Sequence, residues 1–152
     1  MIEVIRTNEN DPDFLALVEL LDAELRVRDG AEHGFYAQFN KPVGLSGVVL
    51  AIENGIPVGC GAFKKYNENT AEIKRMFVKP EARGKRVAAQ IVENLEFWAG
   101  ECGFTECILE TGYKQPEAIA LYTREGYEVI PNYGQYKGVE NSVCMKKIIA
   151  DR

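Results

Sequence analysis

The sequence predicts one mixed α/β domain, and three observations support this expectation. The 152 residues are close to the usual size of a single globular domain, about 100–150 residues. The first half holds short β-rich runs separated by turn residues, and the second half alternates strand and helix patterns. No repeat, low-complexity tract or linker divides the chain. We therefore expect a single domain over residues 1–152.

The N-terminal region predicts a strand followed by a helix. Apolar residues alternate over 2–6, which is typical of a strand. Asp11 then precedes Pro12, the usual combination of an N-cap and a first helical residue. One apolar stripe at three- and four-residue spacing runs until Asp29-Gly30, where the helix is expected to end. The stripe consists of Phe14, Leu17, Val18, Leu21 and Leu25.

The middle of the chain predicts three consecutive antiparallel strands. The runs GVVLAIEN at 47–54 and IPVGCGAFKKY at 56–66 meet at Asn54-Gly55, a strong signal for a tight hairpin. A second polar turn leads into the β-rich run at 71–78, which ends at Lys79-Pro80. Together these runs indicate a three-stranded meander.

The second half predicts alternating helices and strands. Apolar residues at helical spacing over 84–102, closed by Gly103, give the clearest helix of the sequence. Further elements are expected at 105–111 (a strand), 116–125 (a helix), 127–130 and 142–149 (two strands).

The composition favours a soluble protein and excludes some partners. Hydrophobic residues make up 46% of the chain and charged residues 27%. The net charge of -5 provides no cationic field to collect a nucleic acid. The longest apolar runs are far shorter than the ~20 residues that span a membrane. The N-terminus lacks the basic start and apolar middle of a secretory signal, so a cytoplasmic location is expected.

Metal and thiolate chemistry are not indicated. The four cysteines, at positions 60, 102, 107 and 144, fit no zinc-site spacing. His33 is the only histidine, which leaves few soft ligands for a metal. We therefore expect free, mostly buried thiols and no metal cofactor.

A candidate anion site lies between the strand ending at Val78 and the long helix. Arg83, Gly84, Lys85 and Arg86 stand at the N-terminus of this helix. Unpaired backbone N–H groups and the helix dipole favour an anion there, and the cationic side chains surround it. Open α/β sheets usually bind phosphorylated ligands at such a place. A phosphate or pyrophosphate would fit.

Two common nucleotide motifs do not match. The P-loop pattern fails because Lys79 and Arg86 stand where its first glycine and its Ser or Thr should be. The segment 59–64, GCGAFK, lacks the last glycine of a dinucleotide fingerprint and opens no helix. It is better explained as a strand that allows close approach of another element.

The segment RGKRVA at 83–88 resembles the acyl-CoA motif of the Gcn5-related N-acetyltransferase (GNAT) family. This motif consists of Gln or Arg, any two residues, Gly, any one residue, and then Gly or Ala. Arg86 replaces the central glycine. Its backbone is either ordinarily helical or strained in the left-handed region. The blocks AEIKRMFVKPEARGK, ETGYKQPEAIALYTREGYEVIPNY and NSVCMKK extend the resemblance over roughly 70–149.

The resemblance implies a mixed, mostly antiparallel, six- to seven-stranded sheet, splayed at its centre and flanked by helices. It also implies acetyl-CoA as co-substrate, with the pantetheine arm pairing near Met76, Phe77 and Val78. The pyrophosphate would be held by the backbone amides of the motif residues Arg83, Gly84, Lys85, Arg86, Val87 and Ala88. Gln115 stands where many members carry an asparagine that contacts the cofactor.

The resemblance further implies catalytic and acceptor-binding residues. Tyr122 matches the tyrosine usually assigned as general acid, and Glu72 resembles the base position of some members. Glu110, at the end of the splayed strand, is a second carboxylate near the expected acceptor site. The segment 31–40, a short helix or a loop, would fold over the acceptor and contribute Tyr36. The alternatives are a core aromatic for Tyr122 and surface or ion-paired carboxylates.

The expected activity is transfer of acetyl to a primary amine of a small molecule or peptide by direct attack. Three alternatives stay open: a non-catalytic acyl-CoA-binding or sensing module, an interaction protein with a merely solvated basic turn, and a longer acyl donor. Edge strands also leave a homodimer open.

Overall fold

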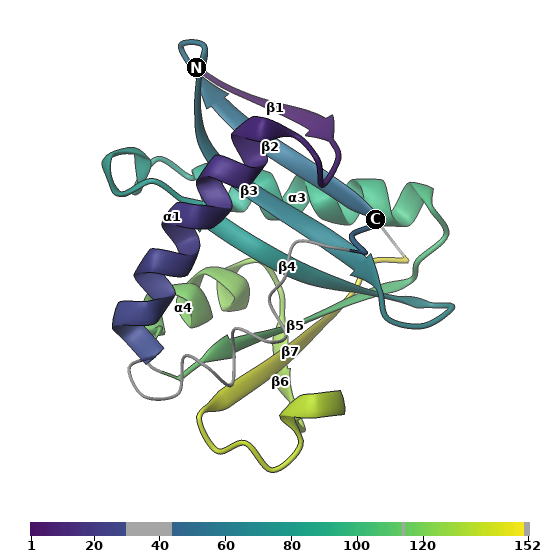
Figure 1. Cartoon of the computed structure of the whole chain (residues 1–152). Coiled ribbons are helices and arrows are strands. Elements are labelled where there is room, and N and C mark those ends of the chain that lie inside the picture. Colours follow the sequence, from purple (N-terminus) through teal and green to yellow (C-terminus); the bar gives the residue numbers. More distant parts are fainter. Residues whose placement is uncertain (30–43, 114, 151–152) are drawn as a thin grey trace.

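The computed structural model describes residues 1–29, 44–113 and 115–150, which form one seven-stranded sheet with helices on both faces (Figure 1). The strands are β1 (Ile2–Thr7), β2 (Gly47–Glu53), β3 (Ile56–Lys65), β4 (Thr70–Val78), β5 (Glu106–Gly112), β6 (Glu128–Ile130) and β7 (Ser142–Ile148). The helices are α1 (Pro12–Asp29), α3 (Val87–Glu101) and α4 (Pro116–Arg124), with short 3-10 turns η2 (Pro80–Ala82) and η3 (Gly134–Tyr136).

The order of the strands is β1-β2-β3-β4-β5-β7-β6. Within this sheet every neighbouring pair is antiparallel except β4 and β5. The hairpin predicted at Asn54-Gly55 joins β2 to β3, and β4 completes the predicted meander. This arrangement confirms the mixed, mostly antiparallel sheet.

The parallel pair β4 and β5 opens after a short common stretch. Its pairing runs only from Thr70 opposite Glu106 to Glu72 opposite Ile108. Beyond this point β4 continues to Val78 and β5 to Gly112, and Figure 1 shows the two strands separating. The sheet is therefore splayed at its centre, as the family resemblance implied.

The helices divide between the two faces of the sheet. One core packs α1 against β2, β3 and β4, with Phe14, Leu50 and Phe77 among its buried residues. The other core packs α3 against the opposite face through Phe63, Ile91, Leu95 and Leu109, and α4 adds Tyr122 to it. Figure 1 shows α1 in front of the sheet and α3 behind it.

The long helix begins later than its apolar pattern predicts. The pattern starts at 84, but α3 begins at Val87. Gly84 has a φ of 82° and Arg86 a φ of 63°, and such left-handed residues cannot continue into a right-handed helix. Residues 84–86 therefore form a turn before the helix. By contrast, α1 begins at Pro12 as predicted, and Asp11 Oδ1 accepts a hydrogen bond from the Asp13 amide at 2.8 Å.

The glycine-rich strand β3 lets α3 approach the sheet closely. A Cβ on Gly61 would lie 2.6 Å from Met76 Sδ, 2.7 Å from Ile91 and 2.9 Å from Leu95. This confirms that the GCG segment serves packing. None of the helices in the described ranges is long and apolar enough to cross a membrane.

We predict that Gly61→Ala destabilises the fold by about 1–3 kcal/mol, because the added methyl overpacks a fully formed core. Chemical denaturation of both proteins measures this difference. Gly100→Ala is the matched control, since nothing lies within 4 Å of a Cβ placed at this position in α3. The control is expected to be neutral or slightly stabilising. Equal effects of both substitutions would contradict the packing role.

Candidate functional site

A cavity of about 660 Å³ occupies the opening between β4 and β5. It is lined by residues of α1, β4, the turn before α3, β5 and α4. Twelve residues singled out from the sequence line it: Glu72, Met76, Phe77, Val78, Arg83, Gly84, Arg86, Val87, Ala88, Glu110, Gln115 and Tyr122. Lys85 does not line the cavity, and Tyr36 lies outside the described residues.

A β-bulge interrupts β4 just beyond the end of its pairing with β5. Cys60 pairs with Phe77 while Ala62 pairs with Lys74, so β4 carries one extra residue there. Arg75, within this bulge, has a φ of 59°, and its buried side chain forms an ion pair with Asp22 of α1. The bulge was not predicted. Its only sequence signal is an arginine within a β-rich run.

The turn between β4 and α3 presents backbone to the cavity. A Cβ on Gly84 would meet nothing within 4 Å, so the backbone there is open to a ligand. The first bond of α3 runs from the Gln90 amide to the Arg86 carbonyl at 3.1 Å. The amides of the preceding first turn have no partner inside the helix, and Val87 and Ala88 line the cavity. This geometry suits an anion.

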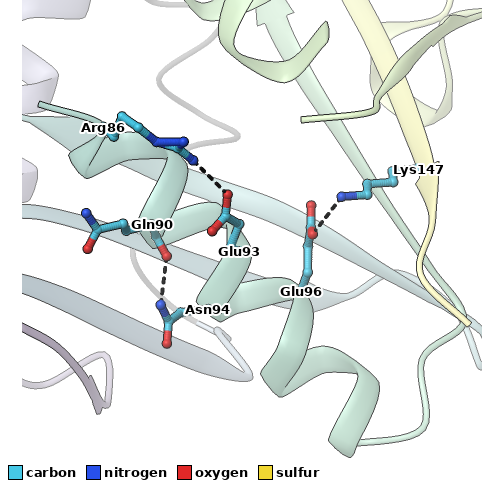
Figure 2. Close-up of polar contacts among 6 residues, drawn as sticks. All are labelled: Arg86, Gln90, Glu93, Asn94, Glu96 and Lys147. Carbon is cyan, nitrogen blue, oxygen red and sulfur yellow. Dashed lines mark hydrogen bonds and ion pairs between the residues drawn. The ribbon is translucent and has the colours of Figure 1, made fainter. Parts of the chain in front are cut away.

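The three cations of the turn form ion pairs with carboxylates. Arg83 contacts Glu24 at 2.6 Å. Arg86 contacts Glu93 at 3.3 Å (Figure 2). Lys85 lies 3.4 Å from Glu53. The cationic side chains of these pairs are 40%, 69% and 51% exposed, and such surface pairs contribute only about 0–1 kcal/mol. A phosphate could therefore exchange for these carboxylates at little cost.

The structure decides between the two backbone conformations considered for Arg86. Its φ of 63° is left-handed, so the arginine keeps the conformation that favours glycine. Arg86 therefore carries a backbone strain that a glycine at this position would avoid.

An ion pair links α3 to strand β7 of the sheet. Glu96, which is fully buried in α3, accepts a hydrogen bond from Lys147 of β7 at 2.9 Å (Figure 2). Lys147 also lies 5.9 Å from the centre of the Tyr127 ring. Removing one partner of such a pair leaves a buried charge uncompensated, so the pair constrains where α3 sits.

Tyr122 lies on α4, and its buried side chain lines the cavity. Its ring packs edge-on against Tyr127, with ring centres 5.6 Å apart. Burial raises the pKa of the Tyr122 phenol well above its ordinary value. The hydroxyl therefore stays protonated at neutral pH and can serve as a proton donor.

Glu72 and Glu110 lie on the sheet face opposite Tyr122. Ala71 and Ile73 of β4, and Leu109 of β5, belong to the core beneath α3. Because strand residues alternate between faces, Glu72 and Glu110 belong to the face of α1. The two carboxylates and the phenol therefore line one cavity from opposite sides of the opening.

Three residues near Glu72 were not found from the sequence. The Tyr133 hydroxyl donates a hydrogen bond to Glu72 Oε2 at 2.7 Å, and Lys74 Nζ lies 3.9 Å from Glu72 Oε1. Tyr136 is buried and lines the cavity. The two tyrosines belong to the segment between β6 and β7, which has no periodicity to indicate its position. Lys74 could have been predicted to lie near Glu72, because residues two positions apart in a strand share one face.

The buried thiols are poor nucleophiles. Burial raises the pKa of Cys60 to about 12 and that of Cys144 to about 11, so both stay protonated at neutral pH. Cys107 is also buried, whereas Cys102 is exposed, and all four are free. Within the described part of the chain, no cluster of His, Cys, Asp or Glu could hold a metal ion.

Comparisons with known proteins identify the family that shares this arrangement. The model of the Acetyltransferase (GNAT) family matches residues 14–127. The IAA acetyltransferase of Azospirillum brasilense is 37% identical over 100 residues, a match that spans 65% of each chain. A solved structure from Klebsiella pneumoniae, classed with the acyl-CoA N-acyltransferases, is 30% identical with a TM-score of 0.83 and 98% of each chain covered.

A more distant structure shares the fold. The PaiA N-acetyltransferase of Thermoplasma acidophilum, solved in complex with coenzyme A, has a TM-score of 0.71 at 18% identity, with 97% of this chain and 99% of that chain covered. The family match over most of the sequence and the Klebsiella likeness over nearly all of it agree with the splayed sheet and its basic turn. The chain belongs to the GNAT acetyltransferase family.

Proposed function

We propose that the protein transfers the acetyl group of acetyl-CoA to a primary amine of a small molecule or peptide by direct attack. The observation that carries the proposal is the cavity between β4 and β5. Its lining includes the turn before α3, which suits an anion, together with a buried phenol and two carboxylates. Donor and acceptor could therefore meet without a covalent enzyme intermediate.

The part of the cavity beside the turn at 83–88 fits coenzyme A in three respects. The amides of the first turn of α3 and the cations Arg83 and Arg86 suit the pyrophosphate. The open edge of β4 at 76–78 offers backbone groups to the amides of the pantetheine arm. Gln115 lines the cavity at the start of α4. The complex of the Thermoplasma relative with coenzyme A supports this assignment.

The acceptor amine must lose a proton before it attacks, because an ammonium has no lone pair. Glu72 is the proposed general base, acting directly or through water. The nitrogen then bonds to the acetyl carbon while the carbon–sulfur bond breaks. Tyr122 gives its hydroxyl proton to the departing sulfur. The nitrogen releases its second proton as the amide forms, and this proton returns to the Tyr122 phenolate directly or through water. Backbone N–H groups at the open strand would polarise the thioester carbonyl as charge develops on its oxygen.

A thiol-release assay with acetyl-CoA and a panel of amines tests the proposal, together with thermal unfolding in the presence of acetyl-CoA. We expect acetyl-CoA to raise Tm and at least one amine to release free CoA thiol. A raised Tm without thiol release across the panel would favour a binding or sensing module. An unchanged Tm would contradict binding of acetyl-CoA altogether.

The left-handed turn yields a further prediction. Arg86→Gly and Arg86→Ala both remove the cation and are expected to raise the KM for acetyl-CoA about three- to tenfold. Arg86→Ala keeps the strained φ of 63°, so it should be about 1 kcal/mol less stable than Arg86→Gly. Steady-state kinetics and denaturant unfolding measure the two effects. Equal stabilities would show that the turn relaxes when the arginine is absent.

A further inference from the structure

One residue inside strand β4 has left-handed backbone. Three non-glycine residues in the described ranges have a positive φ: Asn54, Arg75 and Arg86. Asn54 lies in the hairpin turn and Arg86 in the turn before α3, whereas Arg75 lies within β4. Residues with a Cβ disfavour this conformation, and they keep it only where their surroundings hold them. Contacts that hold the backbone of Arg75 are therefore expected around it.

The bulge at Arg75 reverses the direction of the backbone groups along β4. Before the bulge, the Thr70 carbonyl accepts the amide of Tyr66, directly after β3, at 2.9 Å, so Thr70 faces β3. Regular alternation would turn every second residue after Thr70, Val78 included, toward β3 as well. Instead the Lys79 amide donates to β3 at 2.8 Å, and the Val78 carbonyl accepts Arg83 Nε at 2.8 Å. The extra residue has therefore shifted the alternation by one position.

The shift turns the backbone of Met76 toward the cavity. Strand residues two positions apart present their backbone groups to the same edge, so Met76 faces the opening together with Val78. Both residues line the cavity between β4 and β5. The side chains show the same shift, because Phe77 packs in the core beneath α1 and Val78 in the core beneath α3. The Met76 amide is thus an N–H group available to polarise the thioester carbonyl.

Contacts from α1 and β3 hold Arg75 in this conformation. Its side chain is 1% exposed and forms an ion pair with Asp22 of α1. The Cys60 thiol of β3 donates to the Arg75 carbonyl at 3.4 Å. Arg75 Nε is buried and has no hydrogen-bond partner among the described residues. A buried guanidinium without its carboxylate is costly, so loss of Asp22 would drive the side chain toward water and move the backbone with it.

We propose that Asp22 is a positioning residue for acetyl transfer: its ion pair with Arg75 keeps the bulge of β4 in place and so directs the Met76 amide toward the thioester carbonyl. Asp22 does not line the cavity, so it acts through Arg75 and not on the substrates. This role rests on the proposed function, because the amide acts on a thioester only if acetyl-CoA is the donor.

Asp22→Asn tests the role, because it removes the charge and keeps the shape of the side chain. We expect kcat to fall about tenfold, since small displacements of the reacting groups weaken contacts made in the transition state. The KM for acetyl-CoA should change less than about threefold, because the turn at 83–88 is left intact. Glu19→Gln is the matched control, since Glu19 is exposed on the same helix and does not line the cavity. It should leave kcat and KM within about twofold of the wild type.

Two substitutions of Arg75 separate the effect of its backbone from that of its charge. Arg75→Ala and Arg75→Gly both remove the guanidinium, but only glycine adopts a φ of 59° without strain. Arg75→Gly should therefore retain a kcat about three- to tenfold above that of Arg75→Ala. Asp22→Asn should change the kcat of Arg75→Gly by less than about twofold, because the two side chains act as one pair.

Denaturant unfolding of the same variants measures the ion pair independently of activity. Asp22→Asn should lower the unfolding midpoint of the wild type but not that of Arg75→Gly. An equal shift in both backgrounds would overturn the proposal, because Asp22 would then act through another residue. Should Asp22→Asn fail to fold, the comparison of Arg75→Gly with Arg75→Ala decides.

The kinetic outcomes separate this role from the proposed function. An unchanged kcat in Asp22→Asn, or equal kcat values of Arg75→Gly and Arg75→Ala, would overturn the positioning role while acetyl transfer by the wild type stands. A KM for acetyl-CoA that rises in step with the loss of kcat would also overturn it, because the pair would then only maintain the fold of the site. If the wild type releases no thiol with any amine, the proposed function fails and the role of Asp22 fails with it.

Discussion

Tyr122→Phe is expected to lower kcat about 100-fold at neutral pH while changing the KM for acetyl-CoA less than about threefold. The substitution removes only the hydroxyl that would protonate the departing sulfur. The ring keeps its place because it is buried and packs edge-on against Tyr127 at 5.6 Å. Steady-state kinetics with an accepted amine measure both constants, and the separation of kcat from KM identifies a role in the chemical step.

The pH profile sharpens this expectation. Burial raises the pKa of Tyr122 above the ordinary phenol value, so the wild-type proton donor is not lost between pH 6 and pH 9. The loss caused by Tyr122→Phe should therefore be constant across this range. Tyr127→Phe is the matched control, since Tyr127 is buried beside Tyr122 but does not line the cavity. Equal turnover in wild type and Tyr122→Phe would remove the assigned role.

Local sequence signals predicted most secondary-structure elements. The hairpin at Asn54-Gly55 and the helix beginning at Pro12 depend on turn and capping chemistry that acts within a few residues. The late start of α3 was not predicted, because apolar spacing cannot show that Gly84 and Arg86 adopt left-handed backbone. The place of β1 beside β2 also had no local signal, since their pairing joins residues more than 40 positions apart.

The basic turn of the candidate site could be recognised in the sequence because it is one contiguous motif. The turn at 83–88 requires backbone amides at a helix start, a pattern that a short segment specifies by itself. The surroundings of Glu72 could not be predicted in the same way. Tyr133 reaches Glu72 across 61 positions of sequence, and Tyr136 lines the cavity from an irregular segment between β6 and β7. Such contacts follow from the order of strands, which periodicity does not encode.

The β-bulge at Arg75 is a further feature that the sequence pattern does not predict. A strand pattern predicts regular alternation, whereas the extra residue in β4 changes which side chains reach each face after Lys74. Its stabilising partners are tertiary: Asp22 of α1 pairs with the guanidinium, and the Cys60 thiol donates to the Arg75 carbonyl at 3.4 Å. Both partners lie far from Arg75 in the sequence.

Glu72→Gln should lower kcat about 100-fold at pH 7, because the amide cannot accept the proton of the acceptor ammonium. The defect should shrink as the pH rises toward the pKa of an alkyl ammonium, about 10.4, since a neutral amine needs no base. Glutamine keeps an oxygen for the 2.7 Å hydrogen bond from Tyr133, so the site should retain its shape. Measuring kcat between pH 7 and pH 10 gives the result.

Tyr133→Phe separates proton transfer from orientation. It leaves the Glu72 carboxylate in place but removes the hydrogen bond that fixes its direction. The ring retains edge-on contacts with Tyr66 and Tyr136, with ring centres 5.3 and 5.7 Å away, so the fold should be preserved. We expect a loss of kcat of only about three- to tenfold, smaller than that of Glu72→Gln. A defect of Glu72→Gln that stays constant up to pH 10 would instead mean that Glu72 binds the acceptor and that the amine loses its proton elsewhere.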